Sequence, residues 1–253
     1  MREHNSRGKP DGLVTVTMLP WIKTAADFPA ISRALASPNG LLCAGGNLAE
    51  PTIVTAYCSG IYPWYSVGQP ILWWSPDPRM VLAPNNLRIT KSLAKTMRQG
   101  KFSITFNTAF DQVIAACASP RSEDGGTWIV PEMIAAYTRL HERGVAHSVE
   151  AWVRNEAGAL NLVGGLYGVA LGQVFFGESM FSRATDASKV AFATLMAKLK
   201  ADGFMLIDCQ QETKHLASFG AAPIARASFD KQLRQWINLE QAHLPGGKCS
   251  VWR

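Results

Sequence analysis

The residues with the clearest capacity for chemistry lie in a short segment that mixes polar and aromatic side chains. Residues 175–183 (FFGESMFSR) place a carboxylate, two hydroxyl groups and an arginine among three phenylalanines and a methionine. An apolar wall with a few placed polar groups is typical of a small-ligand site, in which Glu178 would bind a cationic group and the rings would accept an apolar side chain or a base. A strand end whose polar side chains face water fits the segment equally well.

A second polar segment, residues 208–210 (DCQ), follows the apolar run 204–207. The carboxyl ends of strands in open sheets commonly carry ligand groups. Gln210 offers a carbonyl acceptor and an amide donor, which suit it to hold an amine nucleophile, and Asp208 would orient or support a neighbour. Cys209 is a weaker candidate nucleophile, because no histidine partner can be assigned to it. A polar strand end that leads into a turn remains the structural alternative.

Five aromatic side chains are concentrated near turns in residues 62–66 (YPWYS) and 73–79 (WWSPDPR). Clustered tryptophans usually indicate a hydrophobic core. Aromatic rings at loop edges beside Arg79 would instead stack on a terminal nucleotide, a contact worth about 1–3 kcal/mol per base. Trp128, just before a predicted helix, presents the same two alternatives.

Composition and charge set limits on the class of protein. The chain has 253 residues, of which 47% are hydrophobic and 17% charged, so a large core is expected and global disorder is excluded. The net charge of +6 is compatible with an acidic partner such as nucleic acid. Lys91, Lys95 and Arg98 recur at helical spacing and would contact phosphates or form a solvated helix face.

Several common sites are excluded by what the sequence lacks. The five cysteines lie far apart with no C-x-x-C pair, which argues against a zinc site and a disulfide framework. The P-loop, H-E-x-x-H and G-x-S-x-G motifs are absent. Gly164, Gly165 and Gly168 lie inside a strand pattern, where glycine marks a bulge or a close approach more often than a dinucleotide site. With neither a signal peptide nor an apolar run of about 20 residues, a cytoplasmic protein without a membrane partner is expected.

The elements that must position these residues fall into three predicted parts. Residues 1–18 are expected to be a disordered extension, 19–98 a small N-terminal domain and 99–253 the catalytic domain. The small domain has a predicted helix at 51–60, with proline at its start and glycine past its end, and a strand at 71–74.

The catalytic part shows regular periodicity and predicts an α+β fold. Strands are predicted at 102–106, 148–153, 160–169, 173–177 and 204–209, and helices at 111–118, 131–144, 186–200, 213–218 and 228–239. The three strands between 148 and 177 are expected to form an antiparallel meander. Ser228 is the predicted cap of the last helix.

Together, these segments resemble the leucyl/phenylalanyl-tRNA–protein transferases. The resemblance runs from about Leu41 to Gly220, and its most specific blocks are residues 71–79 (ILWWSPDPR) and 177–182 (GESMFS). It implies a leucyltransferase that moves leucine or phenylalanine, and methionine less well, from aminoacyl-tRNA to proteins with an N-terminal lysine or arginine, which marks them for degradation. The ester of aminoacyl-tRNA is already activated, so no metal or other cofactor is implied. A monomer is expected, because nothing in the sequence demands a partner subunit.

The resemblance also implies a fold and a set of site residues. The fold is a small N-terminal domain packed on an acetyltransferase-like (GNAT-type) C-terminal domain, whose mixed, mostly antiparallel sheet is flanked by helices. Gln210 would accept a hydrogen bond from the attacking amine, with support from Asp208, and Glu178 would lie near the basic side chain of the acceptor. The implied substrate-binding residues are Leu166 and Phe175 around the transferred side chain, Trp64 and Trp128 near the aminoacyl-adenosine, and Tyr57 and Ser179. Leu166 departs from the methionine of the family pattern, an exchange that an apolar pocket tolerates.

Two other functions fit part of the pattern. A coenzyme A–dependent N-acetyltransferase would share the implied fold but needs a glycine-rich pyrophosphate loop, whereas residues 183–188 (RATDAS) contain no glycine. A non-catalytic RNA-binding module would use only the basic helix and the aromatic residues.

Overall fold

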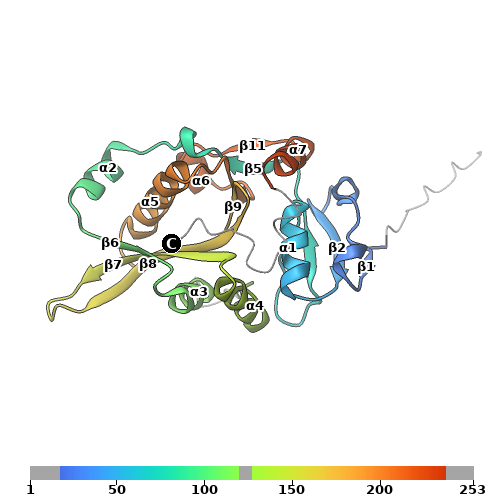
Figure 1. Cartoon of the computed structure of the whole chain (residues 1–253), viewed down its shortest axis with the longest axis horizontal. Helices are drawn as coiled ribbons and strands as arrows, with labels where there is room; N and C mark the ends of the chain where they lie inside the picture. Colours follow the sequence, from blue (N-terminus) through green and yellow to red (C-terminus); the bar gives the residue numbers. More distant parts are fainter. Residues whose placement is uncertain (1–17, 120–126, 238–253) are drawn as a thin grey trace, which may run out of the picture.

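The computed structural model describes residues 18–119 and 127–237, so nearly all of the expected N-terminal extension lies outside the described residues. It contains a four-stranded sheet in the order β1-β2-β4-β3 and a seven-stranded sheet in the order β11-β5-β10-β9-β8-β7-β6. Figure 1 shows the small sheet and α1 at one end of the molecule, with α5 and α6 on one face of the large sheet and α3 and α4 on the other. The predicted α+β class is confirmed.

The small sheet is held together by α1 and buried aromatic residues. Its elements are β1 (Trp21–Ile22), β2 (Leu41–Gly45), α1 (Glu50–Cys58), β3 (Tyr62–Pro63) and β4 (Leu72–Trp74), with two 3-10 helices at Ala25–Asp27 and Ile31–Arg33. Pro51 lies in the first turn of α1, and Gly60 follows its end with a φ of 73°. The fully buried Trp73 indole donates a hydrogen bond to the Gly45 carbonyl at 2.9 Å. The predicted helix and strand of this region are confirmed.

The large sheet is mixed and mostly antiparallel, as expected. Its strands are β5 (Arg79–Leu82), β6 (Ser103–Phe106), β7 (Ala146–Arg154), β8 (Leu160–Leu171), β9 (Val174–Ser182), β10 (Leu206–Gln210) and β11 (Ala222–Ile224). The antiparallel meander is confirmed as β7, β8 and β9, and only β10 pairs in parallel, with β9. The strand β9 continues past the predicted end at Gly177, because residues up to Ser182 pair with β8.

The helices after residue 83 are close to the predicted positions. They are the 3-10 helix Pro84–Asn86, α2 (Lys91–Arg98), α3 (Phe110–Ala118), α4 (Pro131–Glu142), α5 (Ala187–Ala201), α6 (Lys214–Ser218) and α7 (Arg226–Trp236). The predicted cap of the last helix is wrong, because α7 begins at Arg226 with Ala225 at the cap position, and Ser228 lies inside the first turn. The predicted end of this helix, Leu239, lies outside the described residues.

The expected small domain, residues 19–98, contains a strand of the large sheet. Strand β5 pairs antiparallel with both β10 and β11. Helix α2 likewise contacts α5, which covers the large sheet. The small sheet therefore ends with β4, and the chain crosses to the large sheet between Trp74 and Arg79.

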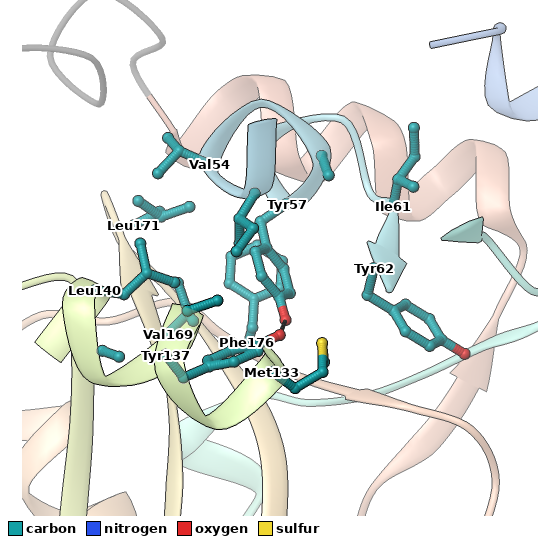
Figure 2. Close-up of a cluster of buried hydrophobic side chains, with 14 of the residues drawn as sticks. Val54, Tyr57, Ile61, Tyr62, Met133, Tyr137, Leu140, Val169, Leu171 and Phe176 are labelled. Atoms are coloured by element: carbon teal, nitrogen blue, oxygen red, sulfur yellow. Dashed lines mark hydrogen bonds between the residues drawn. The ribbon is translucent and has the colours of Figure 1, made fainter. Parts of the chain in front are cut away.

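One hydrophobic core continues from the small sheet into the large one. Figure 2 shows Val54 and Tyr57 of α1 facing Tyr137 and Leu140 of α4 and Phe176 of β9. Each of these aromatic rings is fully buried, and burying such a side chain stabilises the fold by roughly 1.5–3 kcal/mol. A second core cluster lies under α5 and includes side chains of β8, β9 and β10.

Candidate functional site

A pocket of about 570 Å³ lies where β9 and β10 part. The two strands pair only from Val174 to Phe176 on β9 and from Leu206 to Asp208 on β10. Beyond this point β9 continues alongside β8, and β10 bulges as it continues alongside β5. Residues of both parted strands line the pocket, whose volume lies within the usual range of about 300–1,000 Å³ for small-molecule sites.

One wall of the pocket is apolar. It is formed by buried side chains of β8, β9, α5 and β10, among them Leu166, Phe175, Leu195 and Ile207. The ring of Phe175 occupies the space above Gly168, where an added Cβ would lie 2.6 Å from two ring carbons. The sheet also has a bulge between Tyr167 and Gly168, which confirms that the glycines of β8 mark a bulge and a close approach.

Glu178 is the acidic residue of the pocket. Its carboxylate accepts hydrogen bonds from the Tyr137 hydroxyl at 3.0 Å and from Gln210 Nε2 at 2.9 Å. Burial raises the pKa of Glu178 to about 7, against the opposing effect of hydrogen bonds from Tyr57 and Tyr137. The hydroxyls of Tyr57 and Tyr137 are hydrogen-bonded to each other, as Figure 2 shows. Burial and the nearby Glu178 hold the pKa of both phenols well above its usual range, so both remain hydrogen-bond donors.

Asp208 lies behind the pocket in a buried ion pair. Its carboxylate accepts hydrogen bonds from Arg79 Nε at 2.8 Å and from Arg79 Nη2 at 2.6 Å, and both side chains are fully buried. Burial disfavours the charge of Arg79, but the Asp208 carboxylate outweighs it and raises the pKa of Arg79. Nη1 of Arg79 donates to the Gly60 carbonyl at 3.1 Å. In the sequence, Arg79 stands beside aromatic residues that suit either a core or a nucleotide-stacking surface, and nothing there predicts this pair.

Gln210 connects the ion pair to the pocket. Its backbone has a φ of 60°, a left-handed conformation that is uncommon outside glycine, and it lies at a bulge of β10. The backbone N–H of Gln210 donates to Asp208 Oδ1 at 2.9 Å. Because its Nε2 donates to Glu178, the carboxamide oxygen remains as the acceptor.

Aromatic residues from the small sheet and from the segment before α4 form the mouth of the pocket. Tyr62, Trp64 and Trp128 line it, and Trp64 is 37% exposed. Trp74 lies edge-on to Trp64 with ring centroids 5.2 Å apart and donates from Nε1 to the Trp64 carbonyl at 2.7 Å. Trp73 and Trp74 are therefore core residues, whereas Trp64 lines the pocket.

The structure brings the predicted site residues together. Seven of them line the pocket: Trp64, Trp128, Leu166, Phe175, Glu178, Ser179 and Gln210. Tyr57 and Asp208 are fully buried and lie behind these residues. Tyr137 and His215 belong to the site or its support but were not predicted, because nothing in their local sequence distinguishes them from core or surface residues. Arg79 was named only for its place beside the aromatic residues, and its ion pair was not predicted.

The pocket also contains the cysteine that the sequence offered as a weaker candidate nucleophile. Cys209 lines the pocket, but burial raises its pKa far above its usual range, so it does not supply a thiolate. Among the described residues no cluster of three or more His, Cys, Asp or Glu side chains is placed to hold a metal ion. In the same part of the chain no helix has the length and apolar character to cross a membrane.

Comparison with known proteins gives consistent matches. The family described as "Leucyl/phenylalanyl-tRNA protein transferase" matches residues 81–234, and "Leucyl/phenylalanyl-tRNA protein transferase N-terminal domain" matches residues 46–77. A leucyl/phenylalanyl-tRNA–protein transferase of Aromatoleum aromaticum is 57% identical over 221 residues, which cover 87% of this chain and 91% of the relative. One of Stutzerimonas stutzeri is 53% identical over 237 residues, covering 93% of this chain and all of the relative.

Among solved structures, L-PGS from Bacillus licheniformis aligns with a TM-score of 0.37 and 10% identity, covering 77% of this chain and 64% of that chain. A likeness this distant carries no argument about fold or function.

Proposed function

Because this chain belongs to the leucyl/phenylalanyl-tRNA–protein transferase family, we propose that the pocket between β9 and β10 joins an amino acid from aminoacyl-tRNA to the N-terminus of a protein. The amino acid is leucine or phenylalanine, and methionine less readily. The acceptor begins with lysine or arginine and is marked for degradation by the transfer. The observation that carries this proposal is the meeting of an apolar wall with Gln210 and Glu178 in one pocket.

The apolar wall receives the side chain that is transferred. Leu166 and Phe175 lie on adjacent strands and are 3% and 1% exposed, so contact with a leucine or phenylalanine side chain would exclude water. Charged side chains would lose their hydration in this part of the pocket without gaining a partner, which disfavours their transfer.

Gln210 and Glu178 position the acceptor. The free carboxamide oxygen of Gln210 accepts a hydrogen bond from the α-amine, and the carboxylate of Glu178 attracts the basic side chain. The amine nitrogen attacks the ester carbonyl, the C–N bond forms, and the bond to the ribose oxygen of tRNA breaks. The proton lost by the amine balances the proton gained by the ribose oxygen. A carboxamide is too weakly basic to hold that proton, so Gln210 acts by orientation.

The aromatic residues at the mouth of the pocket and the basic helix α2 bind the tRNA. Trp64 and Trp128 stack on the terminal adenosine, and Ser179 completes the substrate site. Tyr57 was expected to bind substrate, but it is fully buried and supports Glu178 from behind the pocket through Tyr137. The basic residues of α2, Lys91, Lys95 and Arg98, are exposed and contact phosphates. The use of aminoacyl-tRNA places the reaction in the cytoplasm.

The architecture that we propose has two domains in a monomeric protein. The small N-terminal domain ends between β4 and β5, and the catalytic domain has an acetyltransferase-like arrangement. The parting of the parallel pair β9 and β10 supports this arrangement, since it leaves a site between two neighbouring strands.

A transfer assay tests the function directly. Leucyl-tRNA and a peptide that begins with arginine are incubated with the protein in EDTA and without ATP, and leucine is sought on the peptide. Transfer to this peptide is expected, together with at least about 10²-fold slower transfer by Gln210→Ala. A matched peptide that begins with glutamate should remain unmodified.

The other outcomes would select different functions. Transfer only to the acidic peptide would change the proposed specificity, and modification by acetyl-coenzyme A would indicate an acetyltransferase. Binding of tRNA without any transfer would indicate a non-catalytic RNA-binding module.

A further inference from the structure

Resting on this proposed function, we infer that Arg79 is a positioning residue of the transfer reaction. By binding Asp208, Arg79 holds Gln210 in the conformation that directs its carboxamide to Glu178 and the pocket. Asp208 acts through this arrangement and does not receive the proton of the attacking amine.

The carboxylate of Asp208 binds protein groups behind the pocket and does not reach the space for substrate. Three donors already occupy its carboxylate, two from Arg79 and one from the Gln210 backbone. The side chain is fully buried, and Asp208 is not among the residues that line the pocket. Taking up a proton would leave the buried charge of Arg79 without its counter-ion, which is strongly unfavourable. The pair is therefore suited to fix geometry and unsuited to move protons.

Arg79 is itself held by four residues, two that accept its hydrogen bonds and two whose aromatic rings it contacts. Its guanidinium binds Asp208 on one side and the Gly60 carbonyl on another. It also lies over the rings of Tyr62 and Phe229, 4.9 Å and 4.7 Å from their centroids. A planar group with five donors makes these contacts at once, whereas a lysine ammonium at the same position would be a single point charge. The position of Asp208 thus depends on a residue that begins β5 and is held by the small sheet and α7.

The conformation of Gln210 is what this support maintains. A left-handed φ of 60° is disfavoured for a side chain of this kind and persists where the surroundings impose it. The hydrogen bond from Gln210 N to Asp208 Oδ1 is the contact that imposes it here. If the carboxylate moves, the bulge relaxes and the carboxamide leaves its 2.9 Å contact with Glu178.

The decisive variant is Arg79→Lys, which keeps the charge but loses the two-point contact with Asp208. In the transfer assay it should lower kcat by about 10²-fold, the effect of misplacing a group by about 1 Å, while KM for leucyl-tRNA stays unchanged. Combined with Gln210→Ala, it should cause no further loss, because the group that it positions is already gone. The inference would be overturned if Arg79→Lys lowered kcat by the same factor in the wild type and in Gln210→Ala. Normal transfer by Arg79→Lys would also overturn it.

A second pair of measurements separates positioning from loss of fold. The double variant Arg79→Met/Asp208→Leu replaces the ion pair by apolar groups, which buried sites commonly tolerate. It should unfold near the wild-type temperature and yet transfer leucine as slowly as Gln210→Ala. Wild-type transfer by this folded variant would overturn the inference.

Hydrogen exchange gives a readout that needs no substrate. The Gln210 amide should exchange slowly in the wild type and at least about tenfold faster in Arg79→Lys, a change of about 1.4 kcal/mol in the opening of its hydrogen bond. Unchanged exchange would overturn the inference. If exchange rises as expected but the wild type transfers nothing, the support of Gln210 by Arg79 stands and the proposed function fails.

Discussion

In the function that we propose, Glu178 attracts a cationic acceptor and must therefore carry a charge, although its burial disfavours that charge. It keeps partial exposure to the pocket, while burial raises its pKa to about 7. The tyrosine hydroxyls oppose this effect by donating to the carboxylate. A cation that binds beside it would lower the pKa further, so acceptor binding and ionisation of Glu178 favour each other.

This environment predicts a pH-dependent stability that Glu178→Gln removes. The folded pKa of about 7 lies above the ordinary value of 4.5, so the native state binds more protons than the unfolded state between these values. The stability contributed by Glu178 is therefore present below pH 4.5 and is lost as the pH rises toward 7. Relative to wild type, the free energy of unfolding of Glu178→Gln should rise by about 2 kcal/mol between pH 5 and pH 8, after a discount for solvent screening.

Urea unfolding at several pH values measures this difference. Tyr137→Phe, which removes a hydrogen bond from the carboxylate, should make the wild-type trend steeper. A difference between Glu178→Gln and wild type that is the same at every pH would show that the carboxylate is not perturbed by burial.

The site residues that could be predicted are those whose chemistry is visible in their own segment. Glu178 and Gln210 stand out because each follows apolar residues and carries a group suited to an amine or a cation. The partner of Asp208 could not be predicted, since Arg79 lies 129 positions away and its local sequence equally suits a surface beside aromatic residues. Pairing across such a separation is a property of the fold.

At the scale of elements, the contact between β8 and β9 shapes the apolar wall. Gly168 lies opposite Gly177, and its missing side chain leaves room for Phe175. Gly164 similarly lets α5 approach β8, because an added Cβ would lie 2.6 Å from the Cβ of Ala187. The glycines of β8 thus place both the pocket wall and the helix that covers it.

Gly168→Ala should disturb this wall. The added Cβ would lie 2.2 Å from the Phe176 carbonyl oxygen and 2.6 Å from the Phe175 ring, so strand and ring must shift. We expect a loss of about 1–3 kcal/mol in the free energy of unfolding, as for other overpacked sites, and a larger KM for leucyl-tRNA. Gly177→Ala is the matched control for stability, because its Cβ would meet only the Asp208 carbonyl at 3.5 Å. Equal stability of the two variants would contradict the expected clash.

The elements that the sequence predicts well are long and periodic. The helices α4 and α5 and the meander β7–β9 each bury one face or a continuous run, which periodicity detects. The strands β2, β5 and β11 were missed, because each is short and lies among glycines and prolines that indicate turns. Ser228 fails as a cap because α7 begins two residues earlier, where Arg226 donates to Asp77 and to the Ser75 carbonyl.

At the scale of the whole molecule, the two sheets share one core and several polar contacts. Tyr57 of α1 is hydrogen-bonded to Tyr137 of α4, and both rings lie in the same hydrophobic cluster as Phe176. Arg79 joins the large sheet to Gly60, at the end of α1. Since Tyr62 and Trp64 at the mouth come from the small sheet and the walls from the large one, the complete pocket requires that the two sheets remain packed together.

The shared core predicts that the two sheets unfold as one unit. Ile53 of α1 is fully buried, and Ile53→Ala should lower the free energy of unfolding by about 2–5 kcal/mol. Measured by hydrogen exchange, the free energy of opening should fall by the same amount for the slowest amides of α1 and of β8, although Ile53 lies on the small-sheet side. Ile89→Ala, at a position that is 42% exposed, serves as the control. It should change the free energies of unfolding and of amide opening by less than about 0.5 kcal/mol. If Ile53→Ala weakened α1 alone, the small sheet would open independently, and the mouth of the pocket could separate from its walls without unfolding the rest.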